Sequence, residues 1–310
     1  MAITPALLFQ GLSGINNKID PSRLPYNPKK GIGELEEAVN CDIDDSMMIT
    51  RRFGQVEISA SSFLTVFCDK GDCFAVMERT DDAAIMLVGA DLSFTGIRSS
   101  LTKGERPGFC QVGSKTYYSS RYQNGVIENG VSGPWPGSAH FGIETTRVFY
   151  DAPLGQHIAY FDGHMLIAQG NVIWISERYE PGKFRMKKNF FQMGTDVRMI
   201  KPVLNGLWVS DSEKTGFVPS GQGQQLANSP FLKKSSFPAH EWSENIELVD
   251  LGKTVIQVPG MSAVWSSDEG LCVGTEDGQL IVTTEDKLFY PAGDIGATVV
   301  DGHNVINSVW

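Results

Sequence analysis

The residue types that bind metals or transfer protons are scattered along this chain of 310 residues rather than grouped. The five histidines stand apart from cysteine and from paired carboxylates in the sequence: His140, His157, His164, His240 and His303. Metal sites require ligands at short, regular spacings. His157 and His164 bracket an expected hairpin, where ordinary cross-strand packing is favoured over a two-histidine metal site. The sequence therefore predicts no metal site and no cofactor.

An acidic segment resembles the start of a calcium-binding loop. Asp42, Asp44 and Asp45 have the spacing of the first ligands. Met47 stands where the loop needs glycine for its sharp turn, and Phe53 stands where it needs a bidentate glutamate. A hairpin turn capped by aspartate side chains is the favoured interpretation.

Catalytic motifs are equally incomplete. Gly221-Gln222-Gly223 starts a dinucleotide-like pattern, but Leu226 occupies the position of the third glycine. Residues 266–270, Ser-Ser-Asp-Glu-Gly, resemble the Asp-box of sialidase-type propellers, with Val273 in place of its tryptophan. That box is structural, and glycoside hydrolysis requires two carboxylates about 5 to 9 Å apart. We predict no catalytic residues and no enzyme activity.

The chain has five cysteines, an odd and scattered set: Cys41, Cys68, Cys73, Cys110 and Cys272. Cys68 and Cys73 flank a tight turn and would face one another across a hairpin, so whether they pair stays open. Free thiols packed as small apolar side chains in a reducing cytoplasm are the favoured interpretation.

The charge balance disfavours specific DNA binding. There are 26 basic and 36 acidic residues, a formal net charge of −10, whereas proteins that grip phosphates usually carry the opposite sign. One local exception is a candidate basic contact patch interleaved with aromatic residues: Arg178, Lys183, Arg185, Lys187 and Lys188. A solvated strand edge or connector is the favoured interpretation, and an acidic protein neighbour or nucleic acid is the alternative.

A recurring unit decides the expected fold. An apolar run, a glycine-containing turn and a second apolar run recur around five marker glycines that are 42, 50, 43 and 64 residues apart: Gly71, Gly113, Gly163, Gly206 and Gly270. Asp-Gly between apolar runs is a hairpin signal, and the clearest example is a three-strand meander over residues 157–177. Spacings of about 40 to 50 residues are typical of propeller blades. We predict an all-β β-propeller of about five blades, within a range of four to six.

The chain divides into two predicted parts. Residues 1–60 form an N-terminal arm and hairpin, because residues 11–30 are rich in glycine, proline and asparagine. Within this part we expect one or two helical turns over residues 34–39 and a hairpin over residues 39–50. Residues 61–310 form the propeller body, with a polar inserted loop at residues 219–240. No apolar run is long enough to span a membrane, and no basic leader precedes the first apolar residues.

The N-terminal part resembles the opening of bacteriophage tail proteins. The family comprises the packaged-DNA stabilisation or tail hub (nozzle) proteins of short-tailed phages and related components of long-tailed phages. Its pattern is a Gly-Ile-Asn-Asn arm that ends near Arg-Leu, followed by an aspartate-rich hairpin and an Arg-Arg turn. It is matched over residues 14–25, 38–45 and 49–54, with departures at Cys41 and Phe53. A weaker similarity covers residues 160–181.

The resemblance implies a structural component of a virion tail, made in the bacterial host cytoplasm. The implied partners are other copies of the chain in a ring, neighbouring tail or adaptor proteins, and DNA that passes without sequence-specific binding. The arm would order on a neighbouring copy. The candidate assembly contacts are Gly14, Ile15, Asn16, Asn17, Asp20, Pro21, Arg23 and Leu24.

Two other functions remain open at this point. The first is a receptor- or carbohydrate-binding propeller at the tail tip, which would be favoured by exposed aromatic residues such as Trp135 and Trp242. The second is a propeller glycosidase, which would require facing carboxylates in a central pocket.

Overall fold

The computed structural model describes residues 11–27, 32–39, 41–43, 48–51, 57, 59–69, 71–137, 148–220, 226–245, 248, 260–284, 287–301 and 304–310. Within these residues the regular structure is almost wholly β-strand, and the two helical elements are short 3₁₀ turns. The expectation of an all-β fold is confirmed.

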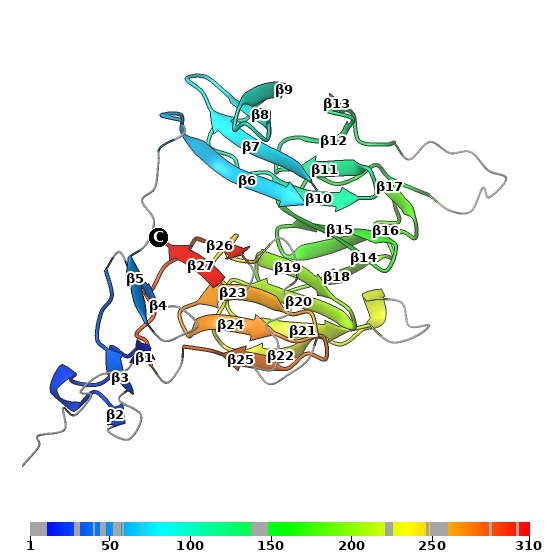
Figure 1. The fold of residues 1–310 in the computed structure, drawn as a ribbon. Helices are drawn as coiled ribbons and strands as arrows, with labels where there is room; N and C mark the ends of the chain where they lie inside the picture. The colour runs from blue at the N-terminus through cyan, green and yellow to red at the C-terminus, as the bar shows by residue number, and fades with distance from the viewer. Residues whose placement is uncertain are drawn as a thin grey trace, which may run out of the picture.

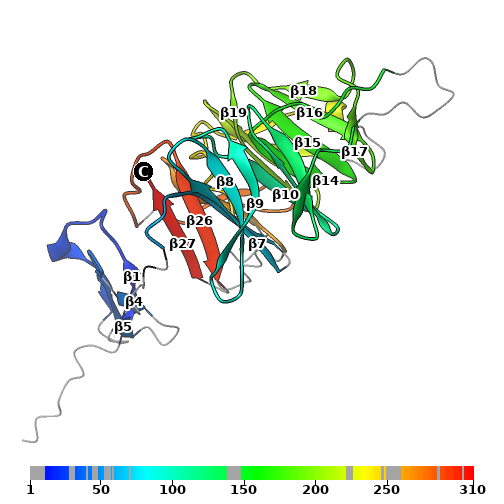
Figure 2. The ribbon, with the colours of Figure 1, turned by 90° about the horizontal axis from the view of Figure 1, so that it is seen from above.

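The first 51 residues hold a small N-terminal module, which we define as residues 11–51. Its three-stranded sheet has the order β1-β3-β2, with β1 and β3 parallel, and a separate antiparallel hairpin pairs β4 with β5. The module lies beside the C-terminal hairpin and away from the other sheets (Figures 1 and 2). Its elements are β1 (Gly11–Ile15), the 3₁₀ turn η1 (Pro21–Arg23), β2 (Tyr26–Asn27), β3 (Ile32–Leu35), β4 (Cys41–Ile43) and β5 (Ile49–Arg51).

Five antiparallel sheets then follow one another along the described part of the chain. The first contains β6 (Phe63–Asp69), β7 (Asp72–Glu78), β8 (Ala83–Val88) and β9 (Phe94–Leu101). The second contains β10 (Gly108–Val112), β11 (Lys115–Ser119), β12 (Asn124–Glu128) and β13 (Val131–Gly133). The third contains β14 (His157–Phe161), β15 (His164–Gln169), β16 (Val172–Glu177), β17 (Glu180–Phe184) and β18 (Phe190–Gln192).

The fourth sheet contains β19 (Val197–Val203), β20 (Gly206–Asp211), β21 (Thr215–Pro219) and β22 (Leu232–Ser235), with the 3₁₀ turn η2 (Leu226–Asn228) between the last two strands. The fifth contains β23 (Ala263–Ser267), β24 (Gly270–Gly274) and β25 (Leu280–Val282). A two-stranded hairpin, β26 (Gly296–Asp301) and β27 (Asn304–Val309), ends the chain.

The sheets are arranged as blades of a β-propeller. The first strands of successive sheets lie side by side, β10 against β14, β14 against β19 and β19 against β23. The strands β6, β10, β14 and β19 line one shared cavity. The ribbon in Figure 1 shows the sheets following one another in chain order.

Hairpin turns set the strand order, as the sequence predicts. In the turn between β14 and β15, Asp162 and Gly163 have φ angles of 46° and 84°. This left-handed conformation is the one that a two-residue primed turn requires, and Asp and Gly tolerate it. The predicted meander over residues 157–177 is confirmed by β14, β15 and β16, which pair in sequence order.

The core lies between the sheets rather than inside any one of them. Four buried clusters each join side chains of neighbouring sheets. In the cluster between the fourth and fifth sheets, the rings of Trp208 and Trp265 are 5.2 Å apart, and each side chain is at most 1% exposed. Because each sheet has two apolar faces, each is covered on both sides only when neighbours stack against it.

Two local expectations are wrong. Residues 32–35 are strand β3 rather than the start of helical turns, because they pair with β1 and β2. Residues 11–30 are not a single extended arm, because β1, η1 and β2 form within them. Pairing with β3 outweighs the local preference of the Gly- and Pro-rich sequence for irregular structure.

The predicted inserted loop at residues 219–240 is partly regular structure. Strand β22 lies within it and pairs with β21, so this part completes the fourth sheet. The polar stretch at residues 221–225 lies outside the described residues. The predicted hairpin over residues 39–50 is confirmed by the pairing of β4 with β5, and its turn also lies outside the described residues.

We predict that Gly274→Ala destabilises the body by about 1 to 3 kcal/mol, the usual cost of overpacking. A Cβ atom at this position would lie 2.5 Å from the Trp208 ring and 2.7 Å from the Trp265 ring. Both rings are buried and rigid, so neither moves away cheaply. The matched control is Gly133→Ala, because a Cβ there meets no atom within 4 Å. The check is the urea midpoint of unfolding, and equal midpoints for the two variants would contradict the prediction.

Candidate assembly surfaces

Both asparagines of the N-terminal Asn-Asn pair form hydrogen bonds within their own chain. Asn16 is 3% exposed. Its backbone N–H donates to the Leu35 carbonyl at 2.7 Å, and its side-chain amide donates to the Glu34 carboxylate at 2.7 Å. These bonds close the end of β1 against β3. The prediction that Asn16 is a contact between copies is therefore corrected.

Asn17 attaches the N-terminal module to the body. Its backbone N–H donates to the Lys287 carbonyl at 2.9 Å, and its side-chain oxygen accepts from the Phe289 N–H at 2.6 Å. One residue thus satisfies two backbone groups of the segment that precedes the C-terminal hairpin, as a paired strand would. The Lys18 ammonium lies 5.8 Å from the centre of the Phe289 ring. Asn17 is itself exposed, so its contact with a second copy stays a prediction.

An ion pair strengthens this attachment. The Lys287 ammonium lies 2.8 Å from the Glu34 carboxylate, whose side chain is only 9% exposed. The hydrogen bond from Lys287, followed by the one from Asn16, holds the pKa of Glu34 below its ordinary value of 4.5.

The other predicted assembly residues lie along the same segment in different roles. Gly14, half-buried with Ile15, has a φ of 126°, which favours glycine. Asp20 caps the turn η1 by accepting from the Ser22 N–H at 2.9 Å. Leu24 is half-buried, whereas Pro21 and Arg23 are exposed and available to a neighbour.

Large apolar side chains are exposed on the module and on the C-terminal end of the chain. We call this group the end apolar set: Tyr26, Val39, Met48, Ile49, Phe289, Val299 and Trp310. Each is at least 47% exposed. Six of them belong to strands or lie within two residues of one, and Phe289 lies in the segment between β25 and β26. The module and the C-terminal hairpin lie at the same end of the molecule (Figures 1 and 2). Where exposed apolar side chains form one continuous patch, they mark a surface that binds other proteins.

The predicted basic contact patch is largely neutralised by its own chain. Three of its members face carboxylates: Arg178 with Asp162 at 2.6 Å, Lys183 with Glu180 at 3.2 Å and Arg185 with Glu177 at 3.6 Å. Lys187 and Lys188 are exposed. Of the five residues in the predicted patch, these two lysines form no ion pair with the described residues.

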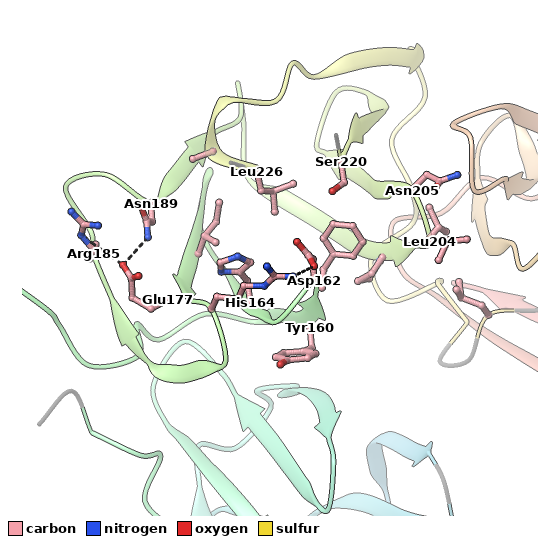
Figure 3. Close-up of a pocket in the computed structure, with 17 residues that line it drawn as sticks. Tyr160, Asp162, His164, Glu177, Arg185, Asn189, Leu204, Asn205, Ser220 and Leu226 are labelled. Atoms are coloured by element: carbon pink, nitrogen blue, oxygen red, sulfur yellow. Dashed lines mark hydrogen bonds and ion pairs between the residues drawn. The ribbon is translucent and has the colours of Figure 1, made fainter. Parts of the chain in front are cut away.

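Arg178 and Arg185 line a surface cavity of about 990 Å³ between the third and fourth sheets. Figure 3 shows Glu177, Arg185 and Asn189 on one side and Leu204 and Asn205 on the other. Each arginine in this cavity has a carboxylate partner. The cavity consequently offers little net charge to a ligand.

His240 lies between a serine and an aspartate, an arrangement that resembles a catalytic triad and that the sequence analysis did not predict. The two ring nitrogens of His240 lie 3.1 Å from Ser266 Oγ and 3.0 Å from Asp268 Oδ1, the order of a serine nucleophile, a base and an acid. Ser266 is 0% exposed and His240 is 2% exposed, so no substrate reaches the hydroxyl. These bonds tie residues 239–243 to β23, and the Asp-box-like segment is structural here.

The aromatic residues proposed for sugar stacking are not available for it. Trp135 is 8% exposed, and its ring N–H donates to the Pro181 carbonyl at 2.9 Å. Trp242 is half-buried and packs against the His157 ring at 4.3 Å. Exposed, stacked aromatic residues were the feature that would have favoured a carbohydrate-binding function.

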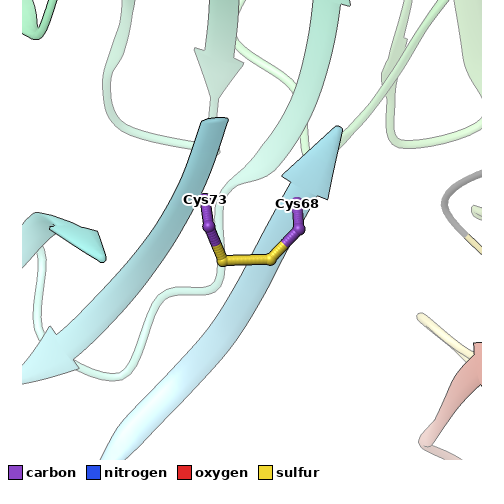
Figure 4. Close-up of a disulfide and its surroundings, with 2 residues drawn as sticks. All are labelled: Cys68 and Cys73. Atoms are coloured by element: carbon purple, nitrogen blue, oxygen red, sulfur yellow. A yellow bond between two sulfur atoms is a disulfide. The ribbon is translucent and has the colours of Figure 1, made fainter. Parts of the chain in front are cut away.

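The expectation of free thiols is wrong for one pair. Cys68 and Cys73 form a disulfide across the β6–β7 hairpin (Figure 4). The strand register places the two residues directly opposite each other, with Cα atoms 4.1 Å apart. Cys110 and Cys272 remain thiols, and the side chain of Cys41 lies outside the described part of the chain.

Two kinds of feature are absent from the described residues. No group of three or more His, Cys, Asp or Glu side chains there is arranged to hold a metal ion. No helix in the same residues has the length and apolar character needed to cross a membrane.

No family model matches the chain, and no curated protein matches it in sequence. Among solved structures, the chain is similar to the extracellular domain of a hybrid two-component system from B. thetaiotaomicron, with a TM-score of 0.48 and 12% identity. That match covers 84% of this chain and 33% of the other, so the chain spans about a third of that protein's length.

The β-propeller domain of Myceliophteria thermophila Cps50 matches with a TM-score of 0.37 and 10% identity over 76% of this chain and 92% of that one. Kluyveromyces lactis Hsv2 matches with a TM-score of 0.35 and 11% identity over 76% and 75% of the two chains. These similarities are too distant to carry a functional conclusion.

We predict that acid loosens the N-terminal module. Because the pKa of folded Glu34 is lowered, its stabilising effect is complete above about pH 4.5 and is lost as the pH falls through the lowered pKa. Glu34→Gln removes the charge at every pH and should speed opening at about pH 6 by two- to fivefold, since Lys287 is 46% exposed and partly screened. The measurement is exchange of the Phe289 amide, corrected for its intrinsic rate, at about pH 6 and about pH 3.

Glu36→Gln is the matched control, because Glu36 is an exposed neighbour on the same segment. It should keep both the slow exchange and its pH dependence. Equal exchange in the Glu34→Gln variant and the wild-type protein at about pH 6 would show that the ion pair does not hold the module.

Proposed function

We propose that the chain is a structural component of a bacteriophage virion tail, as a hub, nozzle or tail-tip ring. In this role it takes part in tail assembly, genome retention and DNA ejection, and it performs no catalysis. Its partners are further copies of itself and neighbouring tail or adaptor proteins. The observation that carries the proposal is the N-terminal module, which is folded apart from the blades and carries much of the end apolar set.

The module is too small to be stable through its own core. Small sheets and single hairpins are marginally stable on their own. The module's polar contacts with the body include those with Lys287 and Phe289. Large side chains such as Ile49 and Val39, which are 49% and 69% exposed, remain in water in a single copy. Contact with a second copy would remove this surface from water, which is the main driving force for association.

The position of the module suits a ring. It lies at one end of the molecule beside the C-terminal hairpin, so one copy offers the module and the next offers another face. Such a head-to-tail interface closes into a ring when the rotation between copies permits it. The net charge of −10 supports a channel along which DNA passes without being held, because like charges repel.

We expect charged substitutions in the end apolar set to prevent assembly. Ile49→Asp and Val299→Asp each place a carboxylate at a surface that the assembly would bury, and each should shift the chain to single copies. The matched control is Val131→Asp on β13, which is 70% exposed and lies far from the module (Figure 1). The measurement is the sedimentation of the full chain over a range of concentrations. A wild-type chain that stays single, or a control that dissociates equally, contradicts the proposed interface.

The virion role has a separate test. An antibody raised against the chain should label the tails of phage particles whose genome encodes this sequence, as seen by electron microscopy. Particles without label on the tail would overturn the virion proposal, even if the isolated chain forms rings.

A further inference from the structure

The cavity at the centre of the propeller gathers unpaired polar atoms. It has a volume of about 380 Å³, within the range of small-molecule sites. Among the described residues, seven buried side-chain nitrogen or oxygen atoms have no hydrogen-bond partner, and four belong to residues that line this cavity: Arg106 Nε, Gln111 Oε1, His157 Nδ1 and Glu244 Oε2. Buried polar groups are normally paired, so this concentration marks a place that a ligand completes.

Two of these residues carry opposite charges that do not pair with each other. Arg106 stays charged at ordinary pH, and its guanidinium lies 4.8 Å from the centre of the Trp242 ring. Burial lowers the pKa of Arg106, and the nearby carboxylates of Glu244 and Glu241 oppose that effect. Glu244 is thus within electrostatic reach of Arg106, yet its Oε2 atom has no hydrogen-bond partner. A ligand that carries both charges would satisfy both groups.

His157 adds an acceptor to the cavity. Its Nε2 atom lies 3.2 Å from the Glu241 carboxylate, and its side chain is 3% exposed. A carboxylate accepts hydrogen bonds, so Nε2 carries a proton, and in the tautomer whose single proton is on Nε2 the Nδ1 atom is an acceptor. Burial alone would raise the pKa of Glu241. The hydrogen bond from His157, together with the charge interactions with His157, Arg121 and Arg198, outweighs this effect, so the pKa is lowered and the carboxylate stays ionised.

The backbone that carries the two glutamates is held in a strained, fixed position. Trp242 has a φ of 66°, which is rare for a residue with a large side chain. The flanking segment is bonded on both sides, because Glu241 N–H donates to the Asp294 carbonyl at 2.8 Å and Asn245 N–H donates to the Val264 carbonyl at 2.9 Å. Strain of this kind persists where the surrounding structure over-determines it, and it occurs most often at binding sites.

We propose that the central cavity binds a small zwitterion of the α-amino acid type. The ligand carboxylate would pair with Arg106, and the ammonium would donate its three N–H groups to Glu244, Gln111 and His157. The lining also includes apolar residues, among them Phe109, Ile158 and Ile200, which favour an apolar side chain on the ligand. This inference stands independently of the virion role.

The test is calorimetric titration of the full chain with each of the twenty standard amino acids, in a buffer without amino acids or amines. At least one amino acid with an apolar side chain should bind, one molecule per chain. The corresponding amine without the carboxylate, and the corresponding acid without the amine, should each bind at least about tenfold more weakly. These comparisons use the wild-type chain, so they do not depend on any variant folding.

The variants Arg106→Gln and Glu244→Gln should each weaken binding at least about tenfold. The matched control is Arg79→Gln, because Arg79 pairs with Asp82 on the surface of the first sheet and removing it changes the net charge by the same amount as Arg106→Gln. Its affinity should equal that of the wild type. Melting curves establish that each variant is folded.

Three results would overturn the proposal. The first is no binding by any of the twenty amino acids up to about 10 mM, which would mean that the cavity holds water only. The second is equal binding by the analogues that lack one charge. The third is binding of a neutral monosaccharide such as glucose with no binding of amino acids.

Discussion

Packing between the faces of neighbouring sheets is the interaction on which the rest of the structure depends. Each blade is thin, and its buried side chains touch those of the next blade rather than a core of its own. Gly274 illustrates how close this packing is, because a Cβ atom at this position would lie 2.5 Å from the Trp208 ring and 2.7 Å from the Trp265 ring. Interiors at this density transmit small changes in shape, so the blades hold one another in position.

The N-terminal module is attached to the rest of the chain differently from the way the blades pack together, and it forms a separate body. Its contacts with the body include hydrogen bonds and an ion pair, centred on Asn17 and Glu34. Contacts of this kind fix direction and register but contribute modest free energy, because water competes for the same groups. A module held in this way keeps its orientation while its apolar side chains remain available to a partner.

Turns that depend on neighbouring residues could be predicted from the sequence, whereas contacts between residues far apart in the sequence could not. The Asp162-Gly163 turn follows from the two residues themselves, so the hairpins and the all-β fold could be predicted. The contact between His240 and Asp268 and that between His157 and Glu241 join residues 28 and 84 positions apart, and no spacing rule reaches that far. The disulfide depended on strand register, which places Cys68 opposite Cys73 only once β6 and β7 have paired.

The segment from Ala239 to Asn245 connects the lining of the central cavity with the C-terminal hairpin. It belongs to none of the sheets, yet it bonds to β23 through His240 and to the start of the C-terminal hairpin through Glu241, whose carbonyl accepts from the Gly296 N–H at 2.9 Å. The same residue places its carboxylate on His157 at the central cavity. One short segment therefore carries hydrogen bonds both to the lining of the cavity and to the hairpin beside the module.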